Sequence, residues 1–355
     1  STLGNSQDFG TLTQGSQAGV GMASRANAFY AGGSLIPAGI NVIEKITIAS
    51  LGNGVDYGDL LTNRAGGSGV SNQIRAIIAG GNANDPTTNV IEYFSMTQSG
   101  NSIDFGDLSL KREATNKGSV NSSTRGLIGG GGSPNTAQID FITMSTLGDS
   151  QDFGDLSATR SSIAGGGNST RGIFAGGATP SGRVNIIEFV TIATTGNAAD
   201  FGDLTVNRET AGGGSNGTRG LYAGGFTSPN SNNVIDYVTI ASTGNAIDFG
   251  DVSEAAGMVG VCNSTRMVIK INNKITSEFI TMSTTGNSTD FGTVTATYTT
   301  ASGDSSTRGI FAGTNGGNVI EFITTATLGN AVDFGDLTQG RGHCDACSNG
   351  HGGLG

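Results

Sequence analysis

The sequence lacks tryptophan and holds only 5 prolines, 3 cysteines and 2 histidines among its 355 residues. So few cysteines exclude a disulfide-stapled scaffold, which needs a much denser set of bridges. With only two histidines, the sequence offers few residues for a catalytic site that uses imidazole. Hydrophobic runs are short too, and none approaches the roughly 18 apolar residues of a membrane-spanning helix. We therefore expect no membrane insertion.

Positive charge is also scarce, since 18 lysines and arginines stand against 28 acids and give a formal net charge of -10. A surface that follows nucleic-acid phosphates or an anionic membrane needs clustered cations, so we expect neither partner. Glycine is abundant instead, with 61 residues, more than twice the usual share of about 7%. Because glycine destabilises helices and 35% hydrophobic residues are too many for a disordered chain, we expect a turn-rich β protein.

A recurring tripeptide, Asp-Phe-Gly or Asp-Tyr-Gly, divides the chain into intervals of 48 residues five times, then 42 and 43. Within each interval, Gly, Asn and Ser turns separate four short segments, three of them with β-branched or aromatic residues. We name these segments a to d, and the clearest set is 162–167, 170–177, 185–192 and 195–204. The tripeptides begin at Asp8, Asp56, Asp104, Asp152, Asp200, Asp248, Asp290 and Asp333.

Four strands repeated seven times predict an all-β fold: a seven-bladed β-propeller with four antiparallel strands per blade, taking in residues 1–355 as one domain. A solenoid is the alternative, but the copy number suits a propeller and neither end carries a distinct polar cap. Segment a, rich in glycine, is expected innermost and segment d outermost. A surplus d-like segment at 3–10 and a surplus a-like segment after Arg341 predict contacts between residues 1–20 and 320–355.

Segment b ends on an aromatic residue followed by Ala-Gly-Gly, at 30–33, 174–177 and 222–225, and segment c carries an acid followed by an aromatic residue. In these features the chain resembles kelch repeats. The amino-acid sequence of its repeat resembles that of kelch-like proteins of marine tailed phages, notably cyanophages. The tryptophan expected after segment c is absent, and blade six reads Lys270-Ile271-Asn272 in place of Ala-Gly-Gly. An arginine before segment a also fits the resemblance, at Arg64, Arg112, Arg160, Arg208 and Arg341.

The repeat accounts for 19 of 22 phenylalanines and tyrosines and for 21 of 28 acids, so we expect scaffold roles for both groups. The rings are expected to pack between blades, and the first Asp of each tripeptide to cap its own turn, with calcium at the paired Asp residues as the alternative. A second arginine series either pairs with the acids of segment c or forms an anion-binding ring at the channel mouth. It comprises Arg75, Arg125, Arg171, Arg219, Arg266 and Arg308.

The tail offers the one cluster of metal-ligand types, His343, Cys344, Cys347 and His351. The same stretch aligns with segment a of another repeat, so an eighth such strand is expected, with zinc or a Cys344–Cys347 disulfide as alternatives. Cys262 is expected to be a small buried residue. Apart from calcium, no cofactor is expected.

The loop between segments b and c varies most between copies and holds all five prolines. We expect these loops to share one face and to bind a partner, because a rigid ring presents its loops in a fixed array. The expected contact residues are Leu35, Ile36, Pro37, Pro86, Pro134, Pro180, Phe226 and Pro229.

No catalytic residue is assigned, so the expected function is that of a non-enzymatic structural or adhesive virion protein. It would be exposed on a phage tail, fibre or capsid and bind other virion proteins, or a glycan or protein of the host surface. Its location on a phage particle comes from the resemblance alone. The alternatives are a polysaccharide-active enzyme and a cellular kelch-type scaffold for protein interactions, and homo-oligomers are compatible with each.

Overall fold

The computed structural model describes residues 19–24, 26–35, 38–47, 50, 54–82, 87–113, 118–209, 211–271, 274–294, 301–304, 307–312 and 319–336. These residues form strands and turns only, so no helix among them could cross a membrane. The expected all-β fold is confirmed. The surplus segment at 3–10 and the tail residues His343, Cys344, Cys347 and His351 lie outside the described residues.

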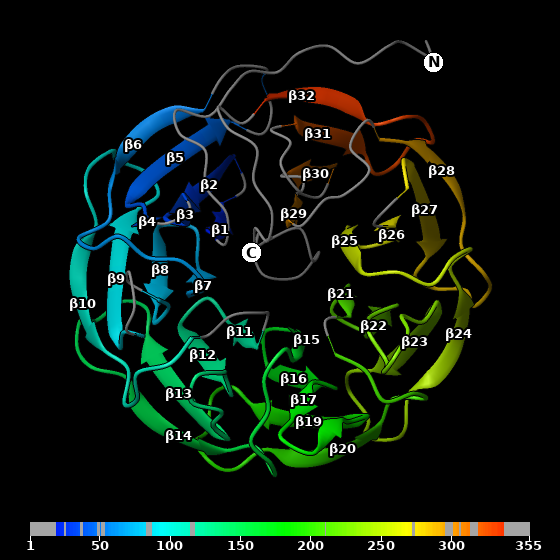
Figure 1. Cartoon of the computed structure of the whole chain (residues 1–355), viewed down its shortest axis with the longest axis horizontal. Helices are drawn as coiled ribbons and strands as arrows, with labels where there is room; N and C mark the ends of the chain where they lie inside the picture. The colour runs from blue at the N-terminus through cyan, green and yellow to red at the C-terminus, as the bar shows by residue number, and fades with distance from the viewer. Residues whose placement is uncertain are drawn as a thin grey trace.

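Seven four-stranded antiparallel sheets follow one another along the chain and stand around a common axis (Figure 1). We call them blades 1 to 7 in chain order. Each blade is one continuous stretch of sequence, and its strands pair in chain order apart from the inserted hairpins β3–β4 and β17–β18. The arrangement of antiparallel four-stranded blades in a propeller is therefore as expected.

The strands of the blades are grouped here by distance from the axis. The a strands are β1 (Val20–Ala23), β7 (Ser68–Ser71), β11 (Ser119–Asn121), β15 (Ala164–Gly167), β21 (Gly212–Ser215), β25 (Met258–Cys262) and β29 (Ala301–Asp304). The b strands are β2 (Asn27–Ala31), β8 (Arg75–Ala79), β12 (Arg125–Gly129), β16 (Arg171–Ala175), β22 (Arg219–Ala223), β26 (Arg266–Ile271) and β30 (Arg308–Ala312). The c strands are β5 (Val42–Thr47), β9 (Val90–Ser95), β13 (Gln138–Thr143), β19 (Ile186–Thr191), β23 (Val234–Thr239), β27 (Thr276–Thr281) and β31 (Val319–Thr324). The d strands are β6 (Val55–Asp59), β10 (Ile103–Asp107), β14 (Gln151–Asp155), β20 (Ala199–Asp203), β24 (Ile247–Asp251), β28 (Thr289–Thr293) and β32 (Val332–Asp336).

The ring closes through its a strands, which lie innermost, while the d strands form the rim (Figure 1). Each a strand contacts the a strand of the next blade, and β29 of blade 7 contacts β1 of blade 1. This contact brings the two ends of the described chain together. The part of the closure expected from residues 1–18 and 337–355 falls outside the described residues.

The hydrophobic core lies between the blades. One cluster joins Leu221 and Phe249 of blade 5 to Met258, Met267 and Ile280 of blade 6, all almost completely buried. Equivalent clusters join each of the other successive blades from 1 to 7, so the sheets of blades 2 to 6 bury both faces against their neighbours. The repeated rings take part in these interfaces, which confirms their expected packing role.

The Asp-Phe-Gly tripeptide forms a β-bulge in each d strand. In blade 3, the Asp152 carboxylate accepts the backbone N–H of Gly154 at 3.0 Å, and the register of β13 and β14 shifts there. The same bond recurs in five other blades, from Gly58, Gly106, Gly202, Gly250 and Gly292 to the Asp two residues before each. The expected turn-capping role of this Asp is confirmed.

The bulge also forms hydrogen bonds with the neighbouring blade at the rim. Gly196, in the turn before the d strand of blade 4, donates its N–H to Phe153 O of blade 3 at 2.6 Å, and Asn197 Oδ1 accepts the N–H of Asp155 at 3.0 Å. A Cβ atom on Gly154 would come within 2.5 Å of Gly196 O, so only glycine allows this approach. The rim is therefore held by backbone contacts that the repeat encodes.

We predict that Gly154→Ala is far more destabilising than Gly182→Ala. Both glycines have nearly the same backbone angle, φ +140° and +138°, but a Cβ on Gly182 has nothing within 4 Å. Gly182→Ala therefore reports conformational strain alone, and Gly154→Ala adds a steric clash costing about 2 kcal/mol or more. Urea denaturation of both variants measures the difference in unfolding free energy. Equal losses of unfolding free energy would show that the close approach of the two blades does not contribute to stability.

Candidate functional site

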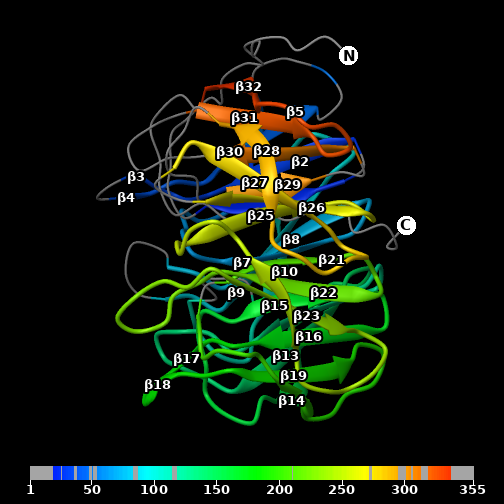
Figure 2. The same ribbon diagram turned by 90° about the vertical axis from the view of Figure 1, so that its right-hand side faces the viewer.

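The b–c loops and the d–a linkers lie on the same face of the ring, because antiparallel strands place alternate connections at the same end. Figure 2 shows two b–c hairpins projecting from this face, β3 (Ser34–Leu35) with β4 (Ala38–Gly39) and β17 (Ala178–Thr179) with β18 (Gly182–Arg183). Single β-bridges join the first part of a loop to the linker entering the same blade, as between Glu209 and Phe226. We call this side the loop face.

The predicted contact residues are placed on the loop face where the structure describes them. Pro134, Pro180 and Pro229 are exposed. Phe226 is half-buried, and Leu35 lies in the hairpin strand β3, where it pairs with Ala38. Ile36, Pro37 and Pro86 lie outside the described residues.

Phe226 packs against a side chain from the neighbouring blade. The guanidinium of Arg183, from the loop of blade 4, lies 4.4 Å above the Phe226 ring of blade 5. Arg183 also donates through Nε and Nη2 to Glu209 Oε1, at 2.9 and 2.6 Å. The loops of two blades are thus joined into one surface. The sequence analysis did not identify Arg183 and Glu209 as residues of this surface. Both are charged and are not among the constant residues of the repeat, and this could have indicated them.

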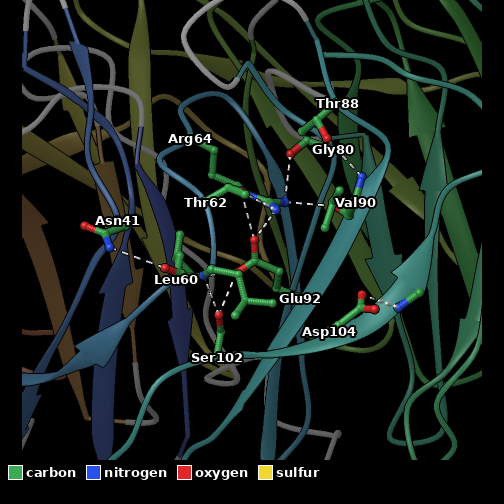
Figure 3. A network of polar contacts seen from close by, with 12 residues as sticks. Asn41, Leu60, Thr62, Arg64, Gly80, Thr88, Val90, Glu92, Ser102 and Asp104 are labelled. Carbon is green, nitrogen blue, oxygen red and sulfur yellow. Dashed lines mark hydrogen bonds and ion pairs between the residues drawn. The ribbon is translucent and has the colours of Figure 1, made fainter.

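A buried arginine beneath the loop face joins each of four linkers to the blade that follows. Figure 3 shows this network around Arg64, which forms an ion pair with Glu92 of the c strand β9. Arg64 Nη1 donates to Val90 O at 2.8 Å and to Gly80 O at 3.2 Å. Both charged side chains are fully buried. Burial lowers the pKa of the Arg64 guanidinium, and the Glu92 carboxylate opposes this shift.

Each of these arginines also holds the preceding blade through its backbone. Arg160 O accepts the N–H of Gly131 in blade 3 at 3.0 Å, while its side chain pairs with Glu188 of blade 4. The adjacent Gly130 has φ +66°, and a Cβ there would lie 2.5 Å from Arg160 O. The arginine before segment a, the glycine doublet after segment b and the acid of segment c therefore form one network. It recurs at Arg64–Glu92, Arg112–Asp140, Arg160–Glu188 and Arg208–Asp236.

Among the described residues, five arginines of the second series form no ion pair with an acid of segment c. The expected pairing was therefore wrong for Arg75, Arg125, Arg171, Arg219 and Arg266. Arg171 instead stacks on the Phe189 ring of its own blade at 4.6 Å and donates through Nη1 to Ile240 O of the next blade at 2.8 Å. The segment c acids of blades 2 to 5 are already paired with the linker arginines. The same stacking places Arg75, Arg125, Arg219, Arg266 and Arg308 over Tyr93, Phe141, Tyr237, Phe279 and Phe322.

Blade 6 departs from the network. Ala256 stands where the linker arginine is expected, and Glu278 accepts hydrogen bonds from Ser253 and Ser288 instead. Lys270, fully buried in β26, donates through Nζ to Ile271 O at 2.6 Å and Lys274 O at 2.7 Å. Burial lowers the pKa of Lys270 to about 8, and Glu321 of blade 7 opposes the shift.

No group of three or more potential metal ligands occurs among the described residues. In blades 1 to 5, the first Asp of the rim pair uses one carboxylate oxygen to accept a hydrogen bond from its own turn, as Asp152 does. Cys262 is buried, in agreement with expectation, and its thiol donates to Ser215 O at 3.6 Å. No protein-family model matches this chain, and no curated protein matches its sequence.

We predict that Glu188→Ala costs about 3–5 kcal/mol of unfolding free energy, because it leaves the buried Arg160 charge uncompensated. Replacing both partners, with Arg160→Met and Glu188→Leu, is expected to cost less than the single substitution. Glu209→Ala is the matched control, since its pair with Arg183 is partly exposed and is worth about 1 kcal/mol or less. Chemical denaturation of the three variants tests this order, and equal losses for Glu188→Ala and Glu209→Ala would contradict it.

We predict that Lys270 makes stability rise with pH above 8. The pKa of Lys270 is about 8 in the folded chain against an ordinary value of 10.5. Between these values the unfolded chain keeps the proton that the folded chain has lost, so raising the pH favours folding. The stability of the wild type relative to Lys270→Met is expected to increase by about 3 kcal/mol across this range. A difference that stays constant from pH 7 to 10.5 would contradict the prediction.

Proposed function

We propose that this protein is a non-enzymatic binding module that recognises a partner through its loop face. The proposal rests on one observation: the constant and the variable residues of the repeat lie in different parts of the blade. The constant residues hold the blades to one another, as Arg160, Glu188 and Gly154 do. The variable residues gather in loops at one face, and the scaffold does not require them. Rigid loops lower the ordering cost of binding, so a shallow face of this kind suits recognition.

Contacts between side chains join the loops of blades 4 and 5 within the proposed surface. Arg183, Glu209 and Phe226 fix two loops relative to each other, and Pro180 and Pro229 stand exposed beside them. Aromatic and arginine side chains are the groups that most often dominate binding surfaces. We therefore place the centre of the proposed contact at this pair of loops.

The class of partner follows from the resemblance to kelch-like proteins of marine tailed phages. We propose a seven-bladed kelch-type propeller exposed on a virion, as part of a tail, a fibre or a capsid appendage. Its partner is another virion protein or a glycan or protein of the host surface. Two features of the repeat sequence support this proposal: the Ala-Gly-Gly endings at 174–177 and 222–225, and the arginine before each of four a strands.

The test is a triple variant of the loop face, Leu35→Ser, Ile36→Ser and Phe226→Ser. We expect it to lose binding to purified virions and to host cells in a pull-down, with a melting temperature within a few degrees of the wild type. A small decrease is expected because Phe226 supports Arg183. The matched control replaces the exposed residues Leu147, Ile247 and Leu328 by Ser; of these, Ile247 lies on the d strand β24 and the other two lie in c–d turns.

Loss of binding in the control variant to the same extent would show that the loop face is not the contact surface. Full binding by the triple variant would have the same meaning. Hydrolysis of a host polysaccharide by the wild type would instead favour a polysaccharide-active enzyme.

A further inference from the structure

Five arginines on the side opposite the loop face carry charges that no acid neutralises among the described residues. No carboxylate lies within ion-pair distance of them, whereas each linker arginine has a buried acid. They are half-buried at the start of the b strands, next to the a–b turns, one per blade in blades 2 to 6. They are Arg75, Arg125, Arg171, Arg219 and Arg266, and we call them the arginine ring.

The guanidinium groups of the ring are fixed with part of their hydrogen-bonding capacity unused. Each is stacked on an aromatic ring of its own blade at 4.5–4.8 Å. Within the described residues, their side-chain hydrogen bonds all start from Nη1, as from Arg219 to Met282 O at 2.8 Å. The Nε and Nη2 donors remain for a ligand. An arginine held in this way loses little side-chain freedom on binding.

A hydroxyl group accompanies each arginine of the ring. The strand register places Arg171 directly opposite Thr191, and Arg219 directly opposite Thr239. Both threonines are exposed. The other pairs are Arg75 with Ser95, Arg125 with Thr143 and Arg266 with Thr281. A guanidinium N–H beside a hydroxyl O–H offers two adjacent donors to the oxygens of a sulfate or carboxylate.

We propose that the arginine ring binds an anionic polysaccharide, with one sulfate or carboxylate group received per blade. The small number of cations, one arginine of the ring in each of blades 2 to 6, favours a polymer with few charges over nucleic acid. Duplex DNA carries one charge per about 1.7 Å of its axis, so it would lay many phosphates across the face for each guanidinium. The rim outside the ring is acidic, with exposed Asp152, Asp200 and Asp248, and repels that surplus.

The experiment uses the full chain with fluorescent dextran sulfate as probe and uncharged dextran as reference. We expect saturable binding of dextran sulfate, with an affinity that falls as salt is added, and no binding of dextran. The variant Arg125→Gln, Arg171→Gln and Arg219→Gln is expected to bind about tenfold more weakly or worse, with a shallower salt dependence. The control Lys111→Gln, Arg183→Gln and Lys274→Gln removes the same charge on the loop side and is expected to retain the affinity.

A second measurement avoids any loss of folding in the ring variant. Phenylglyoxal modifies accessible arginines, and mass spectrometry of the wild type shows which ones dextran sulfate protects. We expect protection of the arginine ring and none of Arg183. Three results would each overturn the proposal: no binding of dextran sulfate, protection of Arg183 instead of the ring, or tighter binding of a single-stranded DNA of equal total charge. None of them bears on the loop face, whose test uses virions and host cells.

Discussion

A buried ion pair between the linker arginine and the acid of the next c strand fixes each of blades 2 to 5 against the blade before it. Arg160 makes four polar contacts: its backbone oxygen accepts the N–H of Gly131 in blade 3, and its side chain reaches Glu188 and two carbonyl groups of blade 4. Such a pair is costly to desolvate, so its partners must all be present and correctly placed. The position of one blade relative to the next is therefore specified by the chemistry of a single residue.

Two further sets of contacts lie at other levels of the same interface. At the rim, the turn containing Gly196 closes over the bulge at Gly154. On the side of the arginine ring, Arg171 spans from the Phe189 ring of its own blade to a carbonyl of the next. Blades 2 to 5 are thus each fixed near the linker, at the outer edge and near the a–b turn. The b–c loops contribute few of these contacts, which is the basis for assigning recognition to them.

Where the repeat changes its residues, the type of interaction is kept. In blade 1, Asn27 replaces the stacking arginine and Lys45 replaces the aromatic residue of the c strand. Lys45 then lies 5.4 Å above the ring of Tyr57, so a cation still covers an aromatic ring although both have changed strands. In blade 6, a buried lysine donates to carbonyl oxygens, as the linker arginines of blades 2 to 5 do.

The class of the fold, the order of the strands and the scaffold role of most aromatic and acidic residues could all be predicted from the amino-acid sequence. A period near 48 residues with four turn-bounded segments leaves few other solutions, and the bulge-forming Asp is a local effect visible in three residues. The placement of the variable loops on one face also follows from strand alternation alone.

Only the tertiary structure decided which arginine meets which acid. Both arginine series recur with the same period as the acids, so periodicity cannot separate Arg64 from Arg75 as the partner of Glu92; the register between the linker and the c strand does. The link from Arg183 to Phe226 was likewise hidden, because it joins unrepeated residues of two loops that meet only when the blades pack side by side.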